Sequence, residues 1–129
     1  MIVVDTSALV AVLLDEPGAE ACASILETEE ECLISAVTLA EAMIVAERRG
    51  AAAELMTMLD GLALEVVPVT MATARAVAAV YRQFGKGHHP AALNFGDCFA
   101  YALARERACS LLFVGNDFSR TDVTPAISP

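Results

Sequence analysis

The best guide to the architecture lies at the start of the chain, which reads Ile2-Val3-Val4-Asp5-Thr6-Ser7. The apolar run Ile2–Val4 predicts a short buried strand, and the polar residues after it predict the start of a helix that continues to about Leu14. In parallel sheets, binding chemistry gathers at the carboxyl ends of the strands. A carboxylate at Asp5 therefore stands where such a site would be built.

Apolar runs and helical patterns alternate along the rest of the chain in the same way. Further strands are expected at residues 32–35, 64–67 and 111–114. Helices are expected from 17 to about 28 and over 36–49, 55–62, 70–84 and 94–107. This alternation predicts an α/β fold of three layers (α/β/α), with helices on both faces of a central, mainly parallel sheet. We expect a single domain over residues 1–129, because the chain is long enough for one core and contains no repeat or linker.

Composition separates this chain from membrane-spanning and exported proteins. The sequence is 57% hydrophobic, yet no uncharged stretch approaches the ~18 residues of a spanning helix, and the N-terminus lacks the basic segment of a signal peptide. We therefore expect a soluble, cytoplasmic protein. The cysteines show no zinc-ligand spacing and are expected to be small buried hydrophobes rather than disulfides: Cys22, Cys32, Cys98 and Cys109.

Charge is distributed unevenly around a net value of −9. Residues 1–65 hold 13 acids and 2 bases, whereas residues 66–129 hold 4 acids and 6 bases. Arg75 and Arg82 are seven positions apart on an expected helix and so share a face, and Lys86 follows just beyond it. These residues form either a phosphate-binding face or an ordinary solvated helix surface.

Four acidic residues each have an ordinary structural role open to them. Asp5 could cap the helix that follows it, and Asp97 stands in the first turn of an expected helix, where the helix dipole favours a carboxylate. Thr38 and Glu41 have the spacing of a capping box. Asp117 lies in a Gly-Asn-Asp sequence that is typical of turns.

Considered together, the same four acids indicate a metal site. Asp5 and Asp117 both follow predicted strands, at the edge where a parallel sheet gathers its chemistry. Glu41 is surrounded by apolar residues, so a buried carboxylate there needs a cation or a hydrogen-bond partner. Clustered carboxylates raise one another's pKa, whereas a hard cation such as Mg²⁺ or Mn²⁺ keeps them ionised.

Several segments carry a family resemblance, and they are Val3-Val4-Asp5-Thr6-Ser7-Ala8-Leu9, Leu39-Ala40-Glu41, residues 93–102 and Leu112-Phe113-Val114-Gly115-Asn116-Asp117-Phe118. In this order they resemble PIN-domain ribonucleases, and specifically the VapC-like toxins of type II toxin–antitoxin systems. The resemblance covers nearly the whole chain, and its most specific part is the Asn-Phe-Gly-Asp-Cys run at residues 94–98. Val114 departs from the pattern, because relatives commonly carry lysine there, which puts one basic substrate contact in doubt.

The resemblance implies a metal-dependent endoribonuclease that hydrolyses RNA phosphodiester bonds. The catalytic residues it implies are Asp5, Glu41, Asp97 and Asp117. As ligands of Mg²⁺, with Mn²⁺ able to replace it, the resemblance implies Asp5, Asp97 and Asp117. Supporting residues would be Thr6, Ser7, Asn116 and Asp122, and candidate RNA contacts are Arg75, Arg82 and Lys86.

The resemblance also implies partners, namely a cognate antitoxin that occludes the acidic pocket and a second copy of the chain in a homodimer. Two other classes stay open. A receiver or phosphatase-like domain also places Asp after its first strand, but this chain lacks the Asp-x-Asp pattern of the phosphatases and the rest of either signature. A non-catalytic module of the same fold could bind RNA or a protein without cutting, and metal-dependent cleavage would separate it from a nuclease.

Overall fold

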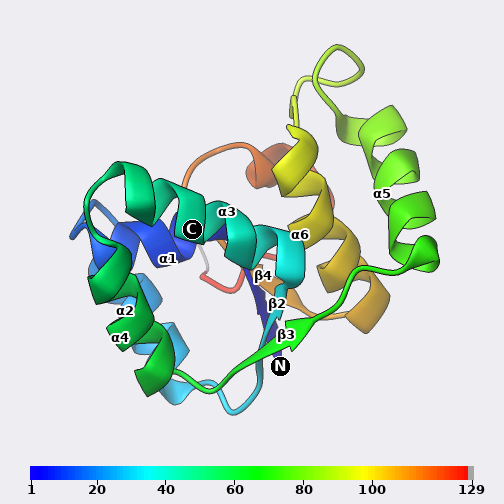
Figure 1. Ribbon diagram of the computed structural model, residues 1–129. Helices are drawn as coiled ribbons and strands as arrows, with labels where there is room; N and C mark the ends of the chain where they lie inside the picture. The colour runs from blue at the N-terminus through cyan, green and yellow to red at the C-terminus, as the bar shows by residue number, and fades with distance from the viewer. Residues whose placement is uncertain (128–129) are drawn as a thin grey trace.

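A four-stranded parallel sheet forms the centre of the computed structural model, which describes residues 1–127 (Figure 1). Its strands are β1 (Ile2–Val4), β2 (Cys32–Ser35), β3 (Leu64–Val67) and β4 (Ser110–Leu112). They are hydrogen-bonded in the order β3-β2-β1-β4, and every neighbouring pair is parallel. Parallel strands end at the same edge of a sheet, so the segments that follow β1 and β4 begin side by side.

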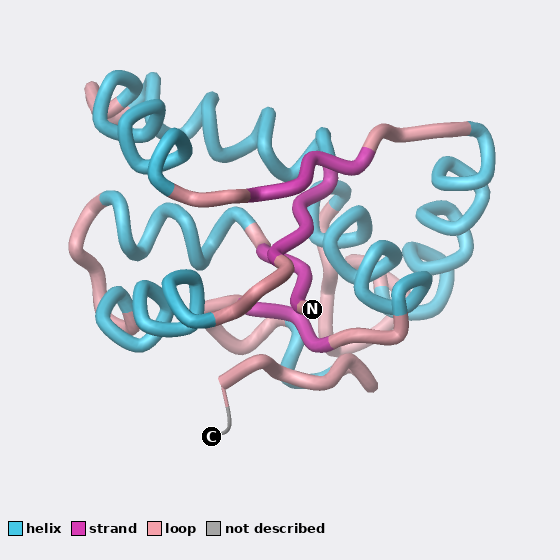
Figure 2. The backbone as a smooth tube through the Cα atoms, turned by 90° about the horizontal axis from the view of Figure 1, so that it is seen from below, coloured by secondary structure: helices cyan, strands magenta, loops and turns pink. Residues whose placement is uncertain are grey.

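Helices cover both faces of this sheet, as Figure 2 shows with the strands in the middle. The helices are α1 (Thr6–Leu13), α2 (Ala19–Thr28), α3 (Ala36–Arg48), α4 (Ala52–Gly61), α5 (Met71–Phe84), α6 (Phe95–Arg107) and the short 3-10 helix η1 (Phe118–Arg120). The predicted three-layer α/β/α fold with a parallel sheet is thus confirmed.

Two apolar clusters lie on opposite faces of the sheet because successive side chains of a strand point to opposite sides. Val3 and Leu33 pack with residues of α5 and α6 on one face. Ile2, Val4 and Ile34 pack with residues of α1, α2, α3 and α4 on the other face. The central strand β1 is fully buried, which fixes the position of the residue that follows it.

Several element bounds differ from the sequence prediction; α2 begins at Ala19 rather than at residue 17, and α4 spans Ala52–Gly61 rather than residues 55–62. Two further differences bear on the site. The last strand ends at Leu112 rather than at residue 114, because Phe113 and Val114 leave the sheet before a left-handed turn at Gly115 (φ 106°). The third helix begins at Ala36 and is capped by Ser35, so the Thr38-x-x-Glu41 capping box is wrong. These two residues lie inside α3, and the Glu41 side chain is not needed at a helix end.

The remaining expectations concern membranes and cysteines. Within residues 1–127, no helix is long and apolar enough to cross a membrane. All the cysteines are free thiols. Cys22, Cys32 and Cys98 are buried as predicted, while Cys109 is partly exposed.

Candidate active site

Asp5 occupies the gap between β1 and α1, where it caps the helix with its side chain. One carboxylate oxygen, Oδ2, accepts hydrogen bonds from the Ser7 backbone N–H at 3.0 Å and from the Ser7 hydroxyl at 2.6 Å. The other, Oδ1, is buried and has no hydrogen-bond partner. Burial raises the pKa of Asp5, the Ser7 bonds lower it, and the charge of Glu41 raises it further. This carboxylate therefore has one oxygen held in place and one without a partner.

Ser7 joins Asp5 to the segment that follows the neighbouring strand β4. Its hydroxyl donates to Asp5 and accepts a hydrogen bond from the Val114 backbone N–H at 3.0 Å. Val114 lies just beyond β4 and three residues before Asp117. One hydroxyl thus ties the first carboxylate of the site to the loop that carries the last one.

Glu41 projects from α3 and is partly exposed. The Thr6 hydroxyl donates to its Oε1 at 2.7 Å and to the backbone oxygen of Thr38 at 3.1 Å. Across from it, a Cβ built on Gly96 would stand 2.8 Å from Oε2 and 2.9 Å from Oε1. The Glu41 carboxylate therefore lies against the first turn of α6 in space that only glycine leaves open. The expected burial of Glu41 is wrong, since it is partly exposed, and Thr6 supplies the hydrogen-bond partner that was expected as one alternative to a cation.

Asp97 is nearly buried, with 9% of its surface exposed, in the first turn of α6. A complete capping box holds it, since its Oδ2 accepts from the Asn94 N–H at 3.0 Å and its own N–H donates to the Asn94 Oδ1 at 2.8 Å. Its pKa is raised to about 6, first by burial and then by the negative charges of Asp5, Asp117 and Glu41. The predicted acids are thus gathered closely enough to act on one another.

Asp117 is the exposed member of the group. It stands at the start of η1, and its side chain makes no capping hydrogen bond. The neighbouring Asn116 is exposed as well, and its backbone oxygen accepts from the Ser119 hydroxyl at 2.7 Å. The Asp117 carboxylate is therefore open to solvent and to a ligand at the rim of the site.

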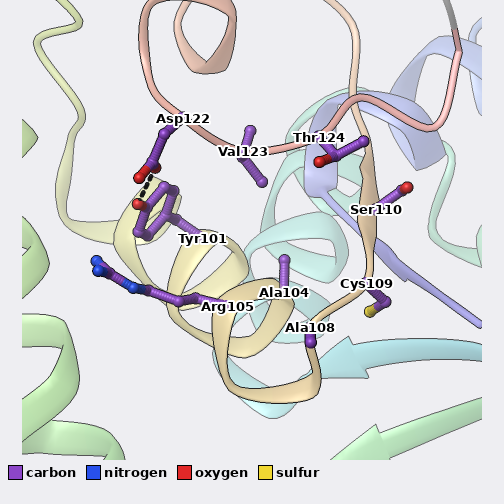
Figure 3. Close-up of a pocket in the computed structure, with 9 residues that line it drawn as sticks. All are labelled: Tyr101, Ala104, Arg105, Ala108, Cys109, Ser110, Asp122, Val123 and Thr124. Carbon is purple, nitrogen blue, oxygen red and sulfur yellow. Dashed lines mark hydrogen bonds between the residues drawn. The ribbon is translucent and has the colours of Figure 1, made fainter.

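Asp122 instead pairs with Tyr101 (Figure 3). The buried Tyr101 donates its hydroxyl hydrogen bond to the Asp122 carboxylate, and burial followed by this contact raises the pKa of Tyr101 to about 12. Both residues line a surface cleft of about 520 Å³ that also includes Ser110, the first residue of β4. The cleft thus extends toward the amino ends of the strands, and Asp122 anchors the segment after η1.

The predicted basic contacts, Arg75, Arg82 and Lys86, are all exposed. Arg75 and Arg82 lie on α5, and Lys86 lies in the loop between α5 and α6. That loop is closed by two backbone hydrogen bonds, from Lys86 N–H to the Leu93 oxygen at 3.0 Å and from Leu93 N–H to the Phe84 oxygen at 3.0 Å. It leads directly to the first turn of α6, which carries Asp97.

A cavity of about 480 Å³ beside Glu41 is lined in part by residues that the sequence analysis did not propose for the site. Its walls are α3 and the first turn of α6, and it includes Arg48 and Phe95. Arg48 follows Glu41 by seven positions on one helix, a spacing that places both on the same face and could have identified it. Phe95 precedes the acid Asp97 by two positions.

The chemistry available at this edge of the sheet is that of oxygen ligands. Within residues 1–127, no three His, Cys, Asp or Glu side chains are placed to enclose a metal ion by themselves. The unpartnered Oδ1 of Asp5, the raised pKa of Asp97 and the open carboxylate of Asp117 nevertheless fit a hard divalent cation that keeps part of its water shell.

The sequence of this chain matches a known protein family and several of its members. The PIN domain model matches residues 2–123. VapC ribonuclease Mb0640 of Mycobacterium bovis is 42% identical over 98% of this chain and 99% of its own length. Ribonuclease VapC of Mycolicibacterium smegmatis is 42% identical over 94% of this chain and 96% of its own.

Solved structures share the fold at lower sequence identity. The Mycobacterium tuberculosis toxin VapC20, described as cleaving the sarcin–ricin loop, aligns with a TM-score of 0.74 and 18% identity over 97% of this chain and all of its own. A toxin–antitoxin complex from Klebsiella pneumoniae aligns with a TM-score of 0.71 and 18% identity over 95% of this chain and 93% of its own.

The fold and the family model define a PIN domain, so the chain belongs to the PIN-domain family. Its near full-length relatives narrow this further. Within that family the chain is a VapC ribonuclease, the toxin class of toxin–antitoxin systems, as the sequence resemblance predicted.

Proposed function

We propose that Asp5, Glu41, Asp97 and Asp117 form the active centre of a Mg²⁺-dependent endoribonuclease, in which Asp5, Asp97 and Asp117 bind the metal. The single observation that carries this proposal is the Asp5 Oδ1 atom, which is buried without a hydrogen-bond partner beside other carboxylates. An unpartnered buried carboxylate oxygen is costly unless a cation completes its shell. Mn²⁺ offers the same preference for oxygen and would replace Mg²⁺.

The mixed exposure of the ligands suits Mg²⁺ in particular. Mg²⁺ keeps several waters and is commonly held by one or two carboxylates together with substrate phosphate oxygens. Asp5 and Asp97 supply the buried side of such a site, and Asp117 supplies an exposed side where RNA would enter. When bound, the ion would lower the pKa of an attacking water and offset charge on the leaving oxygen.

Hydrogen bonds from neighbouring residues fix the positions of these carboxylates. Thr6 fixes one oxygen of Glu41 and leaves the other free to orient a water. Ser7 fixes Asp5 relative to the loop before Asp117. Asn116 supports that loop. Asp122, bonded to Tyr101, anchors the segment after η1, outside the metal site. Arg75, Arg82 and Lys86 would contact phosphates outside the acidic centre.

A cognate antitoxin and a second copy of the chain are the proposed protein partners. Toxin–antitoxin complexes occur among the proteins of this fold. We propose that the antitoxin directs a basic side chain, most simply Arg, toward Asp5 and Asp97, because a cation there replaces the charge of the metal. A complex in which this pocket stays solvated and free of any antitoxin cation would contradict the proposal.

The test of the activity is cleavage of labelled structured RNAs by purified protein in Mg²⁺, Mn²⁺ or EDTA. The variants are Asp97→Asn and, as a matched control, Asp60→Asn, which changes an exposed acid on α4. We expect metal-dependent cutting by the wild type and the control, with a loss of several hundredfold or more in Asp97→Asn. Equal cutting by all three proteins, or cutting that survives EDTA, would refute the assignment.

A further inference from the structure

Phe95 is an exposed aromatic residue directly beside the acidic centre. It is 68% exposed, although large apolar side chains are usually withdrawn from water. It begins α6, and the next residue, Gly96, is the one against which the Glu41 carboxylate lies. Its position is thus fixed relative to the atoms that surround the reacting phosphate in the proposed function.

The Phe95 ring is supported on one side and open on the other. The ring of Phe99, one helical turn later and 6% exposed, packs edge-on against it with centroids 5.0 Å apart and planes at 68°. A T-shaped contact of this kind holds the orientation of an aromatic ring. The open side lines the cavity of about 480 Å³ between α3 and the start of α6.

Polar groups stand at two points of the same cavity. Arg48 lies two helical turns from Glu41 on α3 and supplies a positive charge at the far end. Asn94 uses its Oδ1 in the cap of α6, which leaves its amide NH₂ group able to donate a hydrogen bond. An aromatic ring, a guanidinium and an amide donor are groups that proteins use to bind single-stranded RNA, and here they lie beside the acidic centre.

We propose that this cavity receives one unpaired nucleobase of the RNA, next to the bond that is cut, and that it stacks on Phe95. Arg48 binds the backbone phosphate on the far side of that base, and Asn94 donates to the base edge. The target is therefore a loop or bulge with a base free to leave its stack, rather than a continuous duplex. This inference rests on the proposed nuclease function and adds a base-binding subsite to it.

The first measurement separates RNA binding from cutting. A hairpin RNA with a single-stranded loop carries the fluorescent base 2-aminopurine at one loop position at a time, and binding is followed in Ca²⁺. With the wild type, one position should show quenching on binding. Phe95→Trp should keep this signal, and Phe95→Leu, an apolar side chain without a ring, should lose it. Quenching at no position, or equal quenching with Phe95→Leu, overturns the inference whether or not the protein cuts RNA.

The second measurement is a cycle of protein and RNA changes. In a hairpin that the wild type cuts, each nucleotide flanking the cut is replaced in turn by an abasic one. Loss of one stacked base is expected to lower kcat/KM by roughly 5- to 150-fold. Phe95→Ala should show a similar loss on intact RNA and little further loss on that one abasic RNA. The same factor on intact and abasic RNA at every position would overturn the inference while leaving the nuclease function intact.

A protein side chain is the alternative occupant of the cavity. If Phe95→Ala changes the dimer mass in sedimentation or weakens antitoxin binding, yet leaves RNA binding and cutting unchanged, the cavity serves a protein and the inference is overturned. Because Phe95 is mostly exposed, the variant should fold, and its melting curve checks this. Wild-type protein that stacks 2-aminopurine but cuts no RNA with any metal would instead contradict the proposed function alone.

Discussion

Replacing Asp97 by Asn should make the metal-free protein more stable while removing its activity. Asp97 is nearly buried, and both burial and three negative neighbours raise its pKa from the ordinary 3.8 to about 6. At neutral pH the folded protein must hold this carboxylate ionised against those effects. A rise of this size corresponds to at most about 3 kcal/mol of unfolding free energy, which Asn, being uncharged, would recover.

The gain in unfolding free energy of Asp97→Asn over wild type should increase with pH. Because the pKa is higher in the folded than in the unfolded state, the folded protein binds more protons between about pH 4 and pH 6, so stability falls as pH rises through this window. Above about pH 7 the full difference in unfolding free energy between Asp97→Asn and wild type should be present. It should shrink steadily toward pH 4.5 and vanish only below about pH 3, where the unfolded chain is protonated at this position as well. Asn can still accept the hydrogen bond from the Asn94 N–H, so the cap is kept.

Urea unfolding in EDTA, repeated from pH 4.5 to pH 8, measures this difference. When EDTA is replaced by Mg²⁺ at a hundredfold excess over its Kd, the wild type should gain about 2.7 kcal/mol of unfolding free energy. The difference in stability between Asp97→Asn and wild type should then narrow, because the variant lacks a metal ligand. Asp60→Asn controls for removal of an exposed acid. An Asp97→Asn protein that is less stable than wild type in EDTA at pH 8 would show that Asp97 serves mainly as a helix cap, and the electrostatic reasoning would be refuted.

Further predictions concern the residues that position the carboxylates. Gly96→Ala should keep or raise the melting temperature but lower kcat by at least about tenfold, because its Cβ displaces only the end of the Glu41 side chain; equal activity would place Glu41 outside the reaction. Ser7→Ala should destabilise the protein by about 1–3 kcal/mol and weaken metal binding measured by calorimetry, since the Asp5 carboxylate loses a hydroxyl donor and the partly buried Val114 N–H loses its acceptor. Tyr101→Phe should reduce the unfolding free energy by about 1 kcal/mol and leave the metal Kd unchanged, which a lowered metal affinity would contradict.

Much of the fold was predictable because its strands are short, apolar and followed at once by polar residues. Ile2–Val4 is completely buried, so its composition reports its environment directly. The end of β4 was not predictable, because Phe113 and Val114 are as apolar as the strand before them. Whether they continue the sheet depends on the turn at Gly115 and on a hydrogen bond to Ser7, a residue 107 positions away.

The site shows where sequence patterns stop being informative. Asp5 and Asp97 could be located because a strand end and a helix start both leave a signature in the adjacent residues. The exact fit of Glu41 against Gly96 joins two helices across 55 positions, and no local pattern encodes it. Arg48 shares a helix face with Glu41, but the partner wall of their cavity comes from α6.

The structural and functional interpretations of the acids turn out to describe the same residues. Asp5 does cap α1, and Asp97 completes the capping box of α6 around Asn94; each uses a single carboxylate oxygen, Oδ2, for these bonds. Capping fixes the side chain while a second oxygen remains to be satisfied, and in Asp5 that oxygen is buried. A cap of this kind holds a charge in place without neutralising it, so the metal-free fold carries a local instability that a divalent cation would relieve. Stability without metal and activity with it should therefore respond in opposite directions when Asp97 is changed.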